Sequence, residues 1–169
     1  MSAATPYVAV VGPGEATQAQ FDVALEVGRR LALAGVTVVT GGLGGVMAAA
    51  SQGAVTAGGV TLGLLPGCDR ATANPWLTIA VATGLGELRN GLVVRCADVV
   101  IAVGGAYGTL SEVALALKTM VPVIGLGTWE IAGIEAVASP AAAVARAVEL
   151  APRRPGVGAT SPEGPFKDG

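Results

Sequence analysis

Short apolar runs alternate with longer segments of helical periodicity along most of the chain. The runs have the length and β-branching of buried strands, and they lie at 7–11, 36–40, 60–65, 77–82, 98–103 and 122–126, with a short one near 134–138. Predicted helices lie at 17–34, 46–57, 86–97, 110–118 and 140–150. Because the strands are apolar on both faces, we predict a three-layer, Rossmann-like α/β domain whose mostly parallel sheet has helices on both faces.

This alternation occupies residues 1–151, which we interpret as one domain. From Pro152 onward proline, glycine and charge dominate, which is typical of a disordered tail over 152–169. The start of the chain lacks the basic region of a signal peptide, and no apolar stretch is long enough to cross a membrane. Two cysteines without a pairing pattern favour a reducing cytoplasm, which is the expected location.

The composition removes several classes of function. The chain is 52% hydrophobic and 13% charged, and its net charge is −2, which argues against nucleic acid as a partner. It contains no histidine, so a Ser-His-Asp triad, a histidine base and a histidine metal site are all excluded. We expect no metal and no cofactor. Any catalysis must use carboxylates, arginine, hydroxyls or backbone dipoles.

Three glycine-rich turns, at 12–14, 41–45 and 104–108, follow predicted strands. In a parallel sheet such turns meet at the carboxyl edge, where ligands bind. The third turn also begins a predicted helix, so its backbone N–H groups and the helix dipole favour an anion. We therefore expect a phosphorylated small molecule there. The candidate binding residues are Gly12, Gly41, Gly42, Gly44, Gly45, Met47, Gly104, Gly105, Ala106, Tyr107, Gly108 and Thr109.

A dinucleotide-binding fold fits poorly. The first turn, GPGEAT over 12–17, lacks the third glycine of the dinucleotide fingerprint. The second predicted strand ends at Thr40 and Gly41, with no acidic residue to bind a ribose hydroxyl. The chain also lacks a P-loop motif. NAD and FAD are therefore not expected ligands.

Two charged residues near the third turn have two interpretations each. Glu112, three residues after Thr109, fits a capping box in which its carboxylate binds the Thr109 N–H. Alternatively, it points back towards the turn and faces the sugar of a bound ligand. Arg89 is either a solvated surface cation or a contact to a phosphate or a planar group.

The motifs around these residues resemble those of the LOG-like (SLOG) family. Residues 104–112 read GGAYGTLSE and are similar to the family motif PGGxGTxxE, while residues 40–47 read TGGLGGVM and are similar to GGGxxGxM. Arg89, in the segment ELRN, matches the arginine of the MHERK-like segment. The chain departs from these motifs at Gly104, Ala106 and Asn90, where the family has proline, glycine and lysine.

The resemblance implies a nucleotide-binding fold with Arg89 and Glu112 as catalytic residues. The activity it implies is hydrolysis of the N-glycosidic bond of a nucleoside 5′-monophosphate, which gives a base and ribose 5-phosphate. An alternative is a non-catalytic carrier of a phosphorylated ligand such as molybdenum cofactor or a signalling nucleotide, because the departures resemble the carrier branch of the family. A third is a scaffold with a vestigial site. The family also implies a homodimer or homotetramer.

Overall fold

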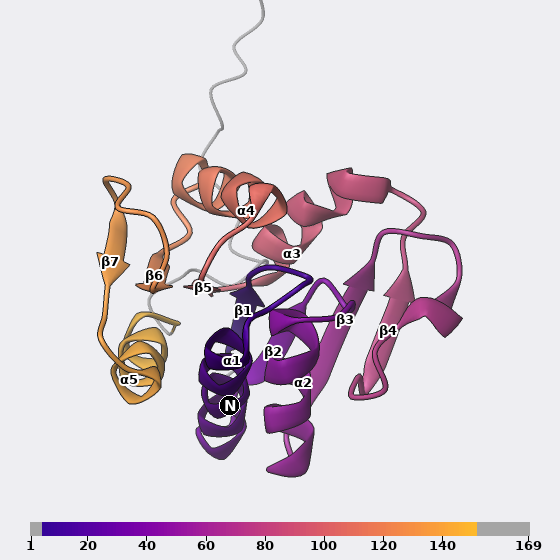
Figure 1. The fold of residues 1–169 in the computed structure, drawn as a ribbon, viewed down its shortest axis with the longest axis horizontal. Helices are drawn as coiled ribbons and strands as arrows, with labels where there is room; N and C mark the ends of the chain where they lie inside the picture. Colours follow the sequence, from indigo (N-terminus) through magenta and orange to yellow (C-terminus); the bar gives the residue numbers. More distant parts are fainter. Residues whose placement is uncertain (1–4, 152–169) are drawn as a thin grey trace, which may run out of the picture.

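The computed structural model describes residues 5–151, which form one seven-stranded sheet in the order β4-β3-β2-β1-β5-β6-β7 (Figure 1). The strands are β1 (Tyr7–Val11), β2 (Thr37–Thr40), β3 (Thr61–Leu65), β4 (Ile79–Ala82), β5 (Val99–Val103), β6 (Val123–Leu126) and β7 (Ile134–Ala136). Every neighbouring pair is parallel. The prediction of a parallel, doubly covered sheet is therefore confirmed. The predicted tail, 152–169, lies outside the described residues.

Five helices cover the two faces of this sheet. Helices α1 (Gln18–Leu33), α2 (Val46–Thr56) and α5 (Pro140–Leu150) pack on one face, and α3 (Asn90–Cys96) and α4 (Tyr107–Lys118) pack on the other (Figure 1). Two short 3₁₀ turns, η1 (Arg70–Thr72) and η2 (Gly86–Arg89), precede β4 and α3. None of the helices in residues 5–151 is long and apolar enough to span a bilayer.

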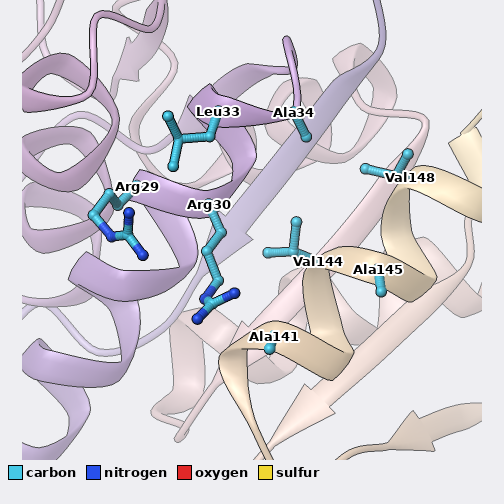
Figure 2. Close-up of a pocket in the computed structure, with 8 residues that line it drawn as sticks. All are labelled: Arg29, Arg30, Leu33, Ala34, Ala141, Val144, Ala145 and Val148. Atoms are coloured by element: carbon cyan, nitrogen blue, oxygen red, sulfur yellow. The ribbon is translucent and has the colours of Figure 1, made fainter.

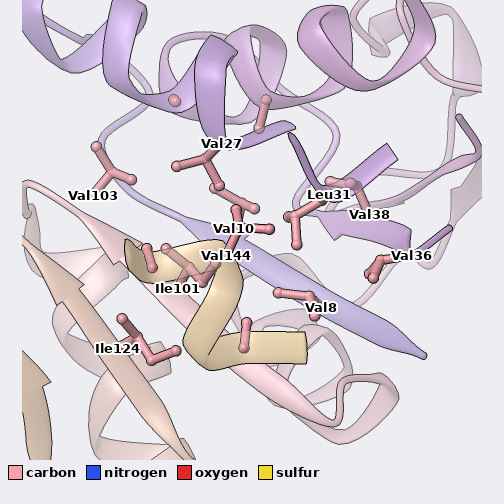
Figure 3. Close-up of a cluster of buried hydrophobic side chains, with 14 of the residues drawn as sticks. Val8, Val10, Val27, Leu31, Val36, Val38, Ile101, Val103, Ile124 and Val144 are labelled. Atoms are coloured by element: carbon pink, nitrogen blue, oxygen red, sulfur yellow. The ribbon is translucent and has the colours of Figure 1, made fainter. Parts of the chain in front are cut away.

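A separate hydrophobic core lies on each face. Alternate residues of β1 supply both cores: Val8 and Val10 face α1, α2 and α5, whereas Ala9 and Val11 face α3 and α4. Figure 3 shows the first core, where Leu31 of α1 packs among the valines of β1 and β2. This two-sided burial explains the continuous apolar strand runs in the sequence.

Helices α1 and α2 pack closely through two glycines. A Cβ atom at Gly28 would collide with the carbonyl oxygen of Ala50, and one at Gly53 would collide with the carbonyl oxygen of Leu25. The close approach fixes the start of α2 beside the first glycine turn, where the Val46 N–H donates to the Pro13 carbonyl at 3.0 Å.

The strand order places the three glycine turns together. Strand β1 lies between β2 and β5, and the first, second and third turns follow β1, β2 and β5 respectively. The order of the strands reverses at this point, which is where open α/β sheets bind ligands. The carboxyl edge of these three strands therefore holds the candidate site.

Two predicted helices have different limits in the structure. The helix predicted from Leu110 begins at Tyr107, so the second half of the glycine turn is its first turn. The helix predicted over 86–97 is divided into η2 and α3, which meet at Arg89 and Asn90. By contrast, the predicted start of α5 is confirmed, with Ser139 as N-cap and Pro140 as the first helical residue.

Candidate functional site

A cavity of about 150 Å³ lies at the carboxyl edge between the first glycine turn and the start of α4. Its walls come from four separated segments of the chain. They are formed by Gly12, Pro13, Gly14, Met47, Arg89, Asn90, Ala106, Gly108, Thr109 and Glu112. Pro13, Gly14 and Asn90 were not among the predicted residues. The first two neighbour a predicted glycine, and Asn90 stood out in the sequence only as a departure from the family motif, which has lysine at that position.

The amino end of α4 provides hydrogen-bond donors. Its N-cap is Ala106, whose side chain accepts no hydrogen bond, and the first helical bond runs from the Leu110 N–H to the Ala106 carbonyl at 2.9 Å. The backbone N–H groups of the first turn of a helix have no partner within the helix. The Thr109 hydroxyl nearby is also buried and has no partner. This helix end is thus suited to bind an anion.

Glu112 does not cap this helix. Thr109 lies inside α4, not at its N-cap, and the carboxylate of Glu112 faces Arg89 instead. The capping-box interpretation is therefore wrong, because the helix begins three residues earlier than the motif suggested. Arg89 is likewise not a solvated surface cation, since only 7% of it is exposed.

Arg89 and Glu112 form a buried ion pair across the cavity. Their Nη1 and Oε1 atoms are 3.7 Å apart, which is too long for a hydrogen bond. The Nε of Arg89 is buried and has no partner at all. The pair therefore leaves hydrogen-bonding capacity free on the guanidinium, and both side chains line the cavity.

Burial shifts the proton affinity of both members of the pair. Loss of solvent raises the pKa of Glu112 from 4.5 to about 7, and the charge of Arg89 only partly opposes this rise. Burial also lowers the pKa of Arg89, against the opposing charges of Glu112 and Glu87. Arginine nonetheless stays charged, so the site carries a fixed cation beside a carboxyl group that titrates near neutral pH.

The second glycine turn supports the site and contributes little to the cavity wall. Gly41 packs against the guanidinium of Arg89, and Gly45 packs against the backbone of Pro13 and Gly14. Gly42 has a φ of 77° and packs on Leu65. Of this segment only Met47 lines the cavity. The predicted glycines at 41–45 therefore position other groups by leaving room for them.

Asn90 connects the two helices beside the cavity. Its side-chain amide donates to the Ser111 hydroxyl at 2.9 Å, and that hydroxyl donates to the Gly108 carbonyl at 2.7 Å. The SLOG motif has a lysine at this position. A neutral side chain, hydrogen-bonded between α3 and α4, therefore stands where the motif would place a second cation.

Gly104 differs from the motif in its backbone conformation. Its φ is +61°, which proline cannot adopt, and its N–H donates to the Leu126 carbonyl at 3.0 Å. Gly104 lines a separate hollow of about 230 Å³ beside Gln20 of α1. Its N–H group is thus engaged within the fold, and it contributes no donor to the cavity.

A wider hollow, of about 440 Å³, lies between α1 and α5 (Figure 2). It is lined by Arg29, Arg30, Leu33, Ala34, Ala141, Val144, Ala145 and Val148. Both arginines pair with Glu26, at 2.7 Å and 2.6 Å. None of the three glycine turns lines this hollow, so size alone does not locate the site.

The smaller cavity contains few kinds of chemical group. It combines the amino end of α4 with one hydroxyl, one guanidinium, one carboxyl group and the side-chain amide of Asn90. Among residues 5–151, no three His, Cys, Asp or Glu side chains come together to hold a metal ion. The arrangement is suited to bind an anionic group, and the carboxyl of Glu112 is the one acid or base in its wall.

Comparison with known proteins identifies a family and several similar proteins. A sequence model of the SLOG cluster4 family matches residues 5–151. A protein of Archaeoglobus fulgidus is 40% identical over 111 residues, which make up 66% of this chain and 73% of that protein. The molybdenum cofactor binding protein of the phototrophic bacterium Rippkaea orientalis is 41% identical, with a TM-score of 0.78 over 83% of this chain and 93% of its own. The molybdenum cofactor carrier protein of Chlamydomonas reinhardtii is 36% identical, with a TM-score of 0.80 over 89% and 99%.

Proposed function

The chain belongs to the SLOG cluster4 family, and on that premise we propose that it is a non-catalytic carrier of a phosphorylated small molecule, with molybdenum cofactor as its ligand. The structural relatives from Rippkaea orientalis and Chlamydomonas reinhardtii, which bind or carry molybdenum cofactor, support this proposal over hydrolysis. The molybdenum is part of the cargo, so the chain needs no metal ligands of its own.

One observation carries the proposal: two buried polar atoms at the site have no partner. They are the Thr109 hydroxyl and the Arg89 Nε, and both belong to residues that line the cavity beside the uncapped end of α4. Leaving buried polar atoms unpaired is costly, and a phosphate group would accept hydrogen bonds from both. We propose that the phosphate lies on the N–H groups at the start of α4, with Arg89 and Glu112 beside it.

Hydrolysis of a nucleoside 5′-monophosphate is the second candidate function. The raised pKa of Glu112 favours it, since a carboxyl group that titrates near pH 7 can act as an acid or a base. Two features weigh against it. Asn90 stands where the motif of the hydrolases has lysine, and Gly104 gives the start of the turn a conformation that proline would not allow.

A homodimer or homotetramer remains part of the proposal. Three leucines are exposed on the segment that carries Arg89: Leu85 just before η2, Leu88 within η2 and Leu92 within α3. Exposed apolar side chains that follow one another in this way favour contact with another surface. Light scattering of the purified chain after size-exclusion chromatography would measure its mass. A monomeric mass at micromolar concentration would contradict the self-association.

The carrier function can be tested by purifying the protein from a host that makes molybdenum cofactor. After denaturation and oxidation, the released pterin is detected by its fluorescence. We expect pterin to copurify with the wild type and to be reduced about tenfold in Thr109→Val, since that variant lacks a charge-assisted hydrogen bond. The matched control is Thr56→Val, at the exposed end of α2, which should retain the pterin.

Incubation with AMP, GMP, CMP, UMP and IMP, followed by chromatography, separates the two candidate functions. The carrier proposal predicts no free base from any of them. Release of a base that is lost in both Glu112→Ala and Arg89→Ala would make the chain a phosphoribohydrolase. Absence of both bound pterin and released base would favour a scaffold with a vestigial site.

A further inference from the structure

We propose that Trp129 is a specificity-determining residue that stacks on the planar heterocycle of the phosphorylated ligand. This inference rests on the proposed function, because it concerns the other end of the same ligand. It draws on three features of the described chain: the size of the cavity, the position of the Trp129 ring against the third glycine turn, and the partial exposure of Trp129.

The cavity is too small for a whole phosphorylated heterocycle. Its volume is about 150 Å³, whereas pockets that enclose a drug-sized ligand measure roughly 300–1,000 Å³. The polar groups in its wall suit a phosphate and the atoms next to it. The remainder of a larger ligand must then lie outside the cavity, along its rim.

Trp129 packs against the third glycine turn, whose residues Ala106 and Gly108 line the cavity. It belongs to the loop between β6 and β7, at the same carboxyl edge as the glycine turns. A Cβ atom at Gly105 would collide with the Trp129 ring and would stand 2.6 Å from Cζ3 and 2.8 Å from Cζ2. The indole therefore rests on the backbone of the turn, one residue before the N-cap Ala106.

Trp129 retains accessible surface in this position. Trp129 is 37% exposed although its ring is seated on Gly105. Tyr107, the first residue of α4, is 91% exposed. The sequence has only two tryptophans, two tyrosines and two phenylalanines, so a third of its aromatic residues flank this one turn. Exposed aromatic faces beside an anion site favour planar rings, which stack on them.

Trp129 is the stronger of these two contacts. Its ring is held against the backbone by Gly105, so little conformational entropy is lost when a ligand stacks on it. Tyr107 is almost fully solvated and must be ordered first. We therefore assign the heterocycle contact to Trp129. A phosphorylated sugar without a ring system gains nothing from it.

Calorimetric titration with matched ligands tests this assignment. The probes are neopterin monophosphate and AMP, which carry a heterocycle, and ribose 5-phosphate, which does not. In Trp129→Leu we expect the affinity for the two heterocyclic phosphates to fall on the order of tenfold. The affinity for ribose 5-phosphate should stay within about twofold, and Trp129→Phe should recover part of the loss.

Fluorescence gives a second readout from the same ligands. The chain has two tryptophans, Trp76 and Trp129, so Trp76→Phe leaves Trp129 as the single indole emitter. AMP should quench this emission at saturation, whereas ribose 5-phosphate should leave it nearly unchanged. Trp76→Phe is also the control for the calorimetry, because Trp76 precedes β4, at the opposite edge of the sheet from the loop between β6 and β7 that carries Trp129.

The outcomes separate this inference from the function on which it rests. If Trp129→Leu binds all three ligands as the wild type does, the stacking contact is overturned and the phosphate site stands. Equal losses for all three ligands would also overturn it, since they would indicate damage to the turn. If none of the three binds to the wild type, the proposed function fails and the contact fails with it.

Discussion

The guanidinium of Arg89 lies directly against the backbone of Gly41, in the space that a Cβ atom would occupy. The Cζ and Nη2 atoms of Arg89 would each be 2.7 Å from such an atom. Gly41→Ala should therefore displace the guanidinium and weaken phosphate binding about tenfold, through loss of a charge-assisted contact. Titration with ribose 5-phosphate would measure the loss.

The same substitution should have little effect on stability. The colliding group is the end of a flexible side chain, so we expect the free energy of unfolding to change by less than about 1 kcal/mol. Gly67→Ala is the matched control, because a Cβ atom there meets nothing within 4 Å. If Gly41→Ala bound ribose 5-phosphate as tightly as the control, the support of Arg89 by Gly41 would be disproved.

The position of the candidate site could be predicted from the sequence because short, contiguous motifs mark it. Glycines that directly follow apolar strand runs identified the turns at 12–14, 41–45 and 104–108. Two-sided apolar strands predict a parallel sheet, and a parallel sheet brings such turns to one edge. The resemblance to the SLOG motifs also implied that Arg89 and Glu112 act at one site, and in the structure their Nη1 and Oε1 atoms are 3.7 Å apart.

The sequence could not predict the partners of these groups. That Gly41 makes room for Arg89, that Gly105 seats Trp129 and that Asn90 bonds to Ser111 all depend on contacts between distant segments. The capping-box interpretation of Glu112 was wrong for a related reason. The first turn of α4 contains Gly108, whose low helix propensity hid from the sequence that the helix begins at Tyr107.

The buried carboxyl of Glu112 should make stability depend on pH between 8 and 5. Its pKa in the folded chain is about 7, above the usual 4.5. Between these values the folded chain binds a proton that the unfolded chain does not. The free energy of unfolding of the ligand-free protein should therefore rise as the pH falls, by up to ~3 kcal/mol. Urea denaturation at several pH values would measure this.

Glu112→Gln supplies the control for that experiment. The amide cannot titrate, so the rise in stability between pH 8 and pH 5 should be absent or much smaller. The range stops at pH 5 because Glu26, whose hydrogen bond from Arg29 lowers its pKa to about 2, stays ionised there. Equal pH dependence in wild type and variant would show that another group is responsible.

Met120 is a position outside the cavity wall where a substitution should raise the stability of the fold. It follows the end of α4 with a φ of 61°, and 85% of it is exposed. A left-handed backbone strains every residue with a Cβ atom, whereas glycine adopts it freely. Met120→Gly should raise the free energy of unfolding by about 1 kcal/mol, measured by denaturant titration. Met120→Ala, which keeps a Cβ atom, should give no such gain.

Restoring the proline of the family motif at position 104 should damage this chain. Proline fixes φ near −65°, whereas Gly104 has a φ of +61°, and its N–H donates to the Leu126 carbonyl at 3.0 Å. Gly104→Pro should therefore lower the free energy of unfolding by about 3 kcal/mol or more. Gly104→Ala should lower it by about 1–2 kcal/mol through backbone strain.

Gly108→Ala is the matched control for these variants. A Cβ atom there meets nothing within 4 Å, and the residue lies inside α4, so alanine should preserve or raise stability. Thermal unfolding of the three variants would decide the matter. If the Gly104→Pro variant were stable and released base from AMP, this fold would be able to accommodate the hydrolase turn. The left-handed backbone at Gly104 indicates instead that this turn has a conformation that the proline of the family motif cannot adopt.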